Sequence, residues 1–88
     1  MSLTDNVIDI RRPVEFTIDG LTYRTSVRQL SAASLLVLAG VDPDAHELRE
    51  LRAHHLHPIR YRQDDLVRVR RGDRYFTVAD LAEGVFAR

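Results

Sequence analysis

The stretch VEFTIDGLTYRT, residues 14–25, decides the expected fold because its apolar and polar side chains alternate more regularly than anywhere else in the chain. Residues 14–18 alternate strictly, which predicts a half-buried strand with its apolar side chains on the inner face. Asp19 and Gly20 follow at once, and this pair suits a type I′ turn, whose two central residues both need positive φ. Residues 21–25 are rich in strand-forming side chains, so the stretch predicts a β-hairpin.

A short helix is expected directly after the hairpin, within residues 26–40. Its apolar positions at helical spacing are Leu30, Ala33, Val37 and Leu38, with Leu35 and Leu36 nearby. Ser31 or Ser34 could cap its start, and Gly40 suits the left-handed position that follows a helix. This region therefore predicts a helix of two to three turns.

Residues 42–57 carry conflicting local signals. Asp42 as N-cap, Pro43 at the first helical position and Leu48 and Leu51 three residues apart favour a second helix. Residues 59–62, 66–70 and 74–78 alternate again and predict further strands, separated by turns at 63–65 and 71–73. A hairpin, a helix and then more strands indicate an α+β fold in which one helix packs on one sheet face.

The order of these pieces resembles the bacterial multiubiquitin-domain family, whose members are ubiquitin-like β-grasp proteins. The matching segments are Phe16-Thr17-Ile18-Asp19-Gly20 with Tyr23, Leu38-Ala39-Gly40-Val41-Asp42-Pro43, Asp64-Asp65-Leu66-Val67-Arg68-Val69 and Tyr75-Phe76-Thr77. Each segment is common by itself, so the resemblance depends on their order and spacing across residues 13–78.

The resemblance implies a ubiquitin-like β-grasp domain at residues 13–78, with a mixed sheet of four to five strands and one helix packed on it. It also implies that residues 46–51 form the middle strand, whereas local propensity predicts a helix there, and we follow the resemblance. Residues 1–12 are then expected to be a flexible N-terminal arm, and residues 79–88 a C-terminal tail.

The resemblance also implies a function, because members of that family are found with E1-like activating enzymes, E2-like conjugating enzymes and JAB-type metalloproteases. The chain is therefore expected to be a protein modifier or its precursor. It has no Gly-Gly pair, and Gly84 is the only glycine after residues 74–78. One hypothesis is that a protease removes Val85–Arg88 and leaves Gly84 as the reactive carboxyl terminus. The alternative, which we prefer, is that Gly84 caps a helical turn over residues 78–84.

A group of arginines forms a candidate partner-docking face. It comprises Arg60, Arg62, Arg68 and Arg70, with Tyr61 between the first two, on strands that we expect to pair with each other. The face could bind the enzymes of a conjugation system or serve a non-conjugated adaptor or subunit. A small nucleic-acid binder is a weaker alternative, because thirteen acidic residues balance the thirteen basic ones. A solvated outer face without a partner is the plainest interpretation.

No other constellation predicts chemistry. The spacing of His46, His54, His55 and His57 matches no standard zinc pattern, so we expect surface histidines and neither a metal nor a cofactor. The sequence contains no nucleophile elbow, no HExxH motif and no glycine-rich phosphate loop, so we do not expect an enzyme. With no cysteine, the chain can form neither a disulfide nor a thiolate metal site.

The basic residues are all arginine, because the chain has no lysine. If it is a modifier, only the amino group of Met1 could accept another copy. We see no signal peptide and no membrane-spanning stretch, so we expect a cytoplasmic protein. The edge strands of a small open sheet could pair between chains, so a homodimer is possible.

Overall fold

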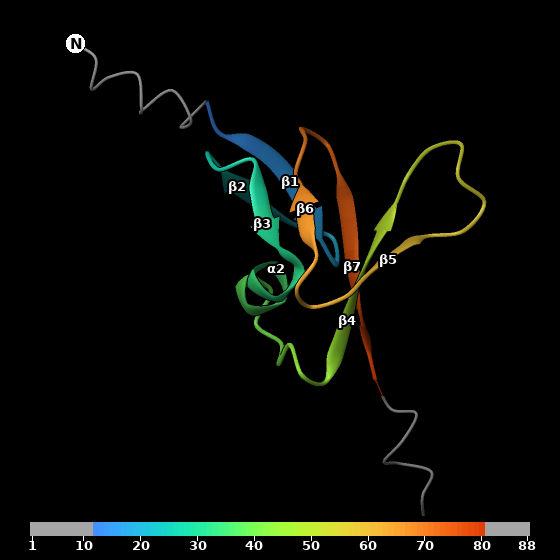
Figure 1. Ribbon diagram of the computed structural model, residues 1–88. Coiled ribbons are helices and arrows are strands. Elements are labelled where there is room, and N and C mark those ends of the chain that lie inside the picture. Colours follow the sequence, from blue (N-terminus) through green and yellow to red (C-terminus); the bar gives the residue numbers. More distant parts are fainter. Residues whose placement is uncertain (1–11, 81–88) are drawn as a thin grey trace, which may run out of the picture.

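The computed structural model describes residues 12–80 and shows one helix packed on a five-stranded mixed sheet (Figure 1). The strand order is β2-β1-β7-β4-β5, and β3 and β6 form a separate two-stranded sheet. The bounds are β1 Val14–Ile18, β2 Leu21–Thr25, β3 Gln29–Ser31, α2 Ala32–Leu38, β4 His46–Leu51, β5 Ile59–Tyr61, β6 Leu66–Arg68 and β7 Arg74–Ala79. The expected α+β, β-grasp-like architecture is confirmed.

The hairpin of β1 and β2 is confirmed, turn included. Asp19 and Gly20 have φ values of 53° and 83°, as a type I′ turn requires. The Asp19 carboxylate also accepts hydrogen bonds from the backbone N–H and the hydroxyl of Thr77, at 2.9 and 2.7 Å. The turn is thereby tied to β7, which pairs in parallel with β1.

Strand β4 settles the conflict over residues 42–57. Residues 46–51 form a strand, as the resemblance implied, and the helix predicted from local propensity is wrong. All six residues of β4 pair with β7, and three also pair with β5. Just before β4, the Asp42 carboxylate accepts from the Asp44 N–H at 2.9 Å, and the Asp42 carbonyl accepts from the Ala45 N–H at 3.0 Å, so the capping signal of Asp42 forms a single turn that leads into the strand.

Helix α2, with seven residues, has about the two turns expected, but Leu30 is not part of it, because Leu30 lies in β3 and pairs with Val67. Its N-cap is Ser31, whose hydroxyl accepts from the Ser34 N–H at 3.0 Å. Its C-terminus is a Schellman motif with Gly40 at a φ of 84°: the N–H groups of Gly40 and Val41 donate to the carbonyls of Val37 and Leu36.

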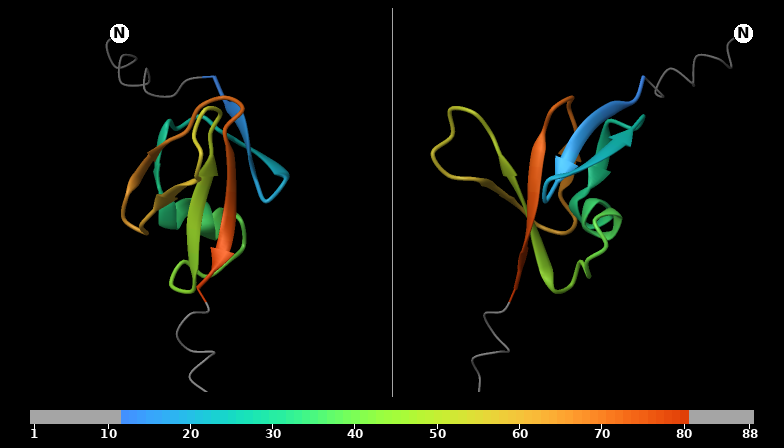
Figure 2. Two further views of the ribbon diagram at one scale, coloured as in Figure 1. Left: turned by 90° about the vertical axis from the view of Figure 1, so that its right-hand side faces the viewer. Right: turned by 180° about the vertical axis from the view of Figure 1, so that it is seen from behind.

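The helix face that packs on the sheet differs from the apolar positions at helical spacing noted in the sequence. Ala32, Leu35 and Leu36 are buried, whereas Val37 and Leu38 are 61% and 46% exposed. The helix starts at residue 32, so the side chains that meet the sheet follow the spacing 32, 35, 36. Figure 2 shows the helix behind β4 and β7 in its left view.

The core lies between the sheet and the layer formed by α2, β3 and β6. It consists of Val14, Phe16, Ile18, Ala32, Leu35, Leu36, Leu48, Val67, Val69 and Tyr75. The Phe16 ring lies 5.9 Å from the rings of both Tyr23 and Tyr75, stacked on the first and edge-on to the second. Within residues 12–80, no helix is long and apolar enough to span a bilayer. The expected N-terminal arm, apart from Arg12, and most of the C-terminal tail fall outside the described residues.

Candidate functional site

The five residues of the predicted docking face lie in two different places. Arg60 and Tyr61 belong to β5, with Arg62 directly after it, whereas Arg68 belongs to β6 and Arg70 lies just beyond. The expectation that these strands pair with each other is wrong, because β5 pairs with β4 and β6 pairs with β3. The structure therefore separates the predicted face into a β4–β5 surface and an arginine groove.

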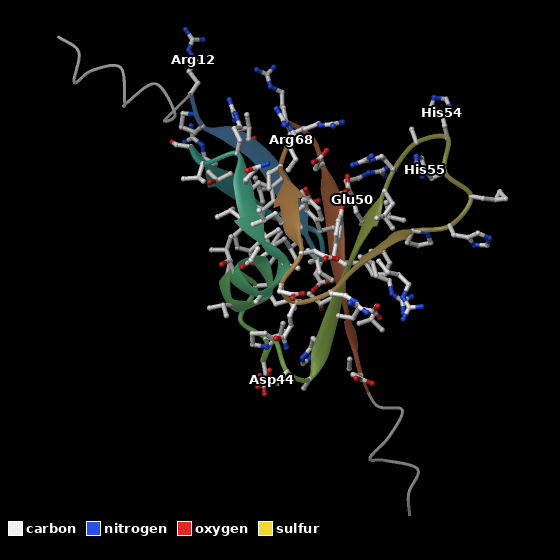
Figure 3. The ribbon with its side chains drawn as sticks, in the orientation of Figure 1. Arg12, Asp44, Glu50, His54, His55 and Arg68 are labelled. Carbon is white, nitrogen blue, oxygen red and sulfur yellow. The ribbon has the colours of Figure 1, made fainter. Side chains whose placement is uncertain are left out.

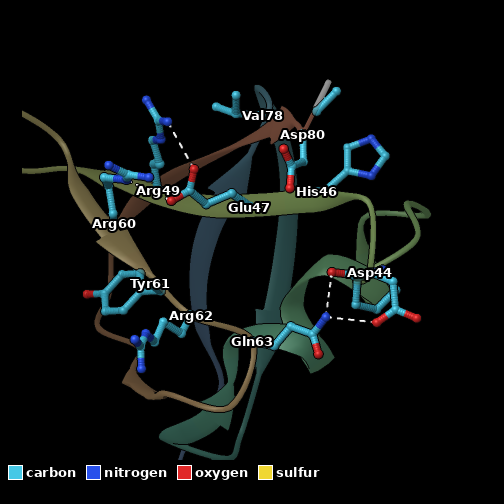
Figure 4. Close-up of a pocket in the computed structure, with 12 residues that line it drawn as sticks. Asp44, His46, Glu47, Arg49, Arg60, Tyr61, Arg62, Gln63, Val78 and Asp80 are labelled. Carbon is cyan, nitrogen blue, oxygen red and sulfur yellow. Dashed lines mark hydrogen bonds and ion pairs between the residues drawn. The ribbon is translucent and has the colours of Figure 1, made fainter. Parts of the chain in front are cut away.

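The β4–β5 surface is centred on Glu47. The register places Arg49 opposite Arg60, and Glu47 lies two residues from Arg49 on the same side of β4. The Glu47 carboxylate accepts from Arg49 Nη2 at 2.9 Å and from Arg60 Nε at 2.7 Å (Figure 4). The hydrogen bond from Arg60, more than that from Arg49, holds the pKa of Glu47 below its ordinary value despite partial burial. The Glu47 carboxylate therefore already balances part of the positive charge of Arg49 and Arg60.

A groove with a volume of about 540 Å³ runs along this surface. Its lining residues are Pro43, Asp44, His46, Glu47, Arg49, Arg60, Tyr61, Arg62, Gln63, Val78, Ala79 and Asp80. The Gln63 side-chain amide closes one wall by donating to the Pro43 carbonyl and to Asp44 Oδ1, at 2.8 and 2.9 Å. Because charges of both signs line it, the groove suits a polar protein segment better than a simple anion.

A buried carboxylate lies on the opposite side of β4 from Glu47. Glu50 is 0% exposed, and its Oε1 accepts from the Tyr61 hydroxyl at 2.6 Å. Arg52 donates to both of its oxygens, at 3.2 and 3.3 Å. Desolvation, followed by the hydrogen bond to Glu50, raises the pKa of Tyr61 to about 12. The polar tip of Tyr61 is thus engaged in a structural network, and the side chain fixes the position of β5 against β4.

Sequence reasoning missed Glu50, although a signal was present. Once residues 46–51 are assigned to a strand, alternation places Glu50 on the same inward side as Leu48. An acid at such a position predicts partners that balance its charge and donate hydrogen bonds to it. The Arg52 guanidinium does both, and the Tyr61 hydroxyl donates a hydrogen bond. Under the local helix interpretation, the same acid would have been an ordinary surface charge.

The arginine groove lies between β3, β6 and the start of β1. Its volume is about 310 Å³, and Val14, Arg28, Arg68, Val69, Arg70 and Arg71 line it. In Figure 3, Arg68 and Arg12 extend from the same end of the molecule, away from the β4–β5 surface. Sequence reasoning identified Arg68 and Arg70 but not Arg28, which precedes β3 by one residue and is brought to β6 only by strand pairing.

The histidines do not converge. His46 lies in β4, where its Nδ1 is 3.0 Å from the Asp42 carbonyl oxygen. His54, His55 and His57 are exposed in the β4–β5 loop, which projects from the sheet (Figure 3). Within residues 12–80, no three or more side chains of the metal-binding types come together.

The comparisons with known proteins find no family model, no curated protein and no solved structure that matches this chain. The fold is therefore established by the structure itself. The resemblance to the multiubiquitin-domain family stays a prediction, and so do the partners that it implies. Gly84, the candidate processing residue, lies outside the described residues.

Proposed function

We propose that this chain is a ubiquitin-like protein modifier or modifier precursor that works in an E1-, E2- and JAB-type conjugation system. The observation that supports the proposal is the topology. A β-hairpin is followed by a helix that crosses the sheet, and the last strand, β7, is inserted in parallel beside β1 at the centre. This arrangement agrees with the β-grasp fold of the family that the sequence resembles.

The second part of the proposal concerns the tail. Strand β7 ends at Ala79, so Val78 and Ala79 lie in a strand, and the helical turn over residues 78–84 that we preferred for Gly84 does not start there. Gly84 follows β7 by five residues. Hydrolysis of the Gly84–Val85 peptide bond would release residues 85–88 and free the Gly84 carboxylate. A terminal glycine suits the narrow sites of activating and conjugating enzymes, because it has no Cβ. The β4–β5 surface would then supply the contact by which those enzymes recognise the folded part.

Expression of the chain with an N-terminal affinity tag in its native host tests the proposal. Under denaturing purification, we expect adducts in which the Gly84 carboxyl forms an amide with a substrate amine, identified by peptide mass spectrometry. Gly84→Ala should abolish the adducts, whereas Glu83→Ala, the matched control, should keep them. If every purified chain still ends at Arg88 and no adduct forms, the chain is not a modifier.

A second candidate is a non-conjugated interaction module, an adaptor or subunit. The groove of about 540 Å³ on the β4–β5 surface favours it, because the groove is complete within the described residues and needs no tail chemistry. The two candidates differ in one measurable respect. An adaptor keeps its partners after Gly84→Ala and loses them after Arg60→Glu, which reverses the charge at the edge of the groove. We assign a catalytic role to no residue in either case.

A further inference from the structure

The arginine groove differs from the groove on the β4–β5 surface in having no acid among its lining residues. Four of its six lining residues are arginines, and the other two, Val14 and Val69, are buried. The backbone positions the arginines closely: the Val69 N–H donates to the Arg28 carbonyl at 2.8 Å, and β3 and β6 pair Gln29 with Arg68. The groove is therefore a concave, cationic site on a rigid apolar floor.

Within residues 12–80, no acid lies within ion-pair distance of the arginines of this groove. None of the ion pairs within residues 12–80 includes Arg28, Arg68, Arg70 or Arg71. The acid nearest to them along the chain, Asp73, uses its Oδ2 to accept from the Arg70 N–H and the Tyr75 hydroxyl, at 2.8 and 2.9 Å. Four like charges in one depression repel each other and thereby destabilise the fold, and a bound anion would offset that repulsion.

One donor in the groove is buried as well. Nη1 of Arg28 is shielded from solvent and has no acceptor within the described part of the chain. A buried charged donor without an acceptor is costly, and native structures rarely keep one without a partner. Nε of Arg49 is also buried without an acceptor, but its guanidinium is already paired with Glu47 through Nη2. Arg28 is thus a half-buried groove arginine with one guanidinium nitrogen that the fold shields from solvent and leaves without an acceptor within residues 12–80.

We propose that the arginine groove binds the phosphate group of a small phosphorylated ligand. Planar guanidinium groups present pairs of N–H donors that match the spacing of phosphate oxygens, and several of them can share one multiply charged group. The site is a single depression, and Arg60 and Arg62 lie on the other surface. This compact arrangement suits a small ligand better than a nucleic-acid strand, which needs a charged track. The inference does not depend on the proposed modifier function.

Titration of the isotopically labelled full chain with pyrophosphate, followed by NMR, tests the inference. Sodium chloride keeps the ionic strength constant, so general screening does not change. We expect saturable shifts confined to the backbone amides of residues 67–71 and of Arg28, with a fit to one site. Shifts that grow without saturation, or that spread over the β4–β5 surface, would overturn the proposal.

Variants locate the site. Arg28→Gln and Arg71→Gln should each weaken pyrophosphate binding about tenfold or more, because each removes a charge-assisted contact. Arg71 is exposed, so its variant keeps the test valid even if Arg28→Gln unfolds the chain. Arg60→Gln, at an arginine already bound to Glu47, is the matched control and should leave the affinity unchanged. If Arg60→Gln loses as much affinity for pyrophosphate as the groove variants do, their loss reflects the change in net charge and not a binding site in the groove.

A final experiment distinguishes the two ligands that could supply the phosphate group, a small phosphorylated molecule and a nucleic acid. A short single-stranded oligonucleotide should bind no more tightly than pyrophosphate at the same ionic strength. If it binds more tightly, with an affinity that falls steeply as salt rises, the groove is part of a nucleic-acid surface and the small-ligand assignment is wrong.

Discussion

The β4–β5 region and the arginine groove use the same side chain in opposite ways. On the β4–β5 surface, Arg49 and Arg60 share the carboxylate of Glu47, and on the opposite side of the strand Arg52 holds Glu50. In the groove, arginines meet only valines and other arginines. An arginine paired with an acid helps to hold strands in register. An arginine that has no ion pair and lies beside other arginines is available for a ligand. Pairing, and not residue type, separates the arginines that hold acids within the fold from those that we propose bind a ligand.

Breaking the ion pair between Arg52 and the buried Glu50 should have the largest effect on stability. Arg52→Met removes the guanidinium and leaves the fully buried Glu50 carboxylate with only the Tyr61 hydroxyl. We expect a loss of about 3 kcal/mol in the free energy of unfolding, measured by urea denaturation, because an uncompensated buried charge is strongly destabilising. The double variant Arg52→Met/Glu50→Gln should regain part of that loss. A loss below about 0.5 kcal/mol for Arg52→Met, the range of ordinary surface substitutions, would contradict the structural role of this pair.

Tyr61→Phe should have the next largest effect. It removes the 2.6 Å hydrogen bond to Glu50, and we expect a cost of about 1.5 kcal/mol at neutral pH. The cost should also depend on pH. The pKa of Tyr61 rises from its ordinary 10 to about 12 on folding, so its stabilising contribution is complete below pH 10 and falls as pH rises towards 12. The stability difference between the two proteins should therefore shrink over that range, and a constant difference would show that the hydroxyl titrates normally.

Glu47→Gln should have a smaller effect, confined to the ion pairs that Glu47 forms with Arg49 and Arg60. The pKa of Glu47 lies below its ordinary value of 4.5 in the folded chain, so its contribution is present above pH 4.5 and is lost as pH falls through the lowered pKa. We expect a difference of about 0.5 kcal/mol from the unmodified protein at pH 7 that disappears on acidification. Thermal unfolding at a series of pH values measures it, and a difference that persists in acid would contradict the pairing.

Arg70→Gln should have the smallest effect on stability, although it lies in the groove. Its side chain is exposed and has no ion pair within residues 12–80, so we expect a change within about 0.5 kcal/mol of zero. A slight gain would agree with relief of like-charge repulsion. A large loss, seen in the same urea series as Arg52→Met, would mean that the groove arginines are structural and would remove the contrast between the two regions.

The parts that the sequence predicted well are those decided by neighbours along the chain. Alternation from residue 14 to residue 25 and the Asp19-Gly20 turn predict the hairpin, because both depend on local geometry. The same logic identifies Gly40 at the end of the helix, and the alternation over residues 66–70 puts Val67 and Val69 on one face, which the structure buries. In the candidate site, it identified Arg60 and Arg68 as exposed charges but could not say which of them have partners.

Local propensity failed where distant segments compete. Residues 46–51 carry helix signals, yet β7 offers a full ladder of hydrogen bonds and the core accepts Leu48, so the strand is favoured. The helix face was wrong for a related reason: pairing of β3 with β6 draws Leu30 out of the helix and moves its start to Ala32. In each case, a contact more than 20 residues away along the chain outweighed a nearest-neighbour preference.

The sequence by itself determined the hairpin, the helix with its caps, and a surplus of arginine over acidic residues between residues 46 and 76. Only the tertiary structure decided which arginines have counter-charges. Strand order is set by burial of the shared core. That order brings Glu47 to Arg60, whereas it brings Arg28 to Arg68, where no acid of residues 12–80 forms an ion pair with it. Charge composition is a property of the chain, but charge pairing depends on which strands become neighbours.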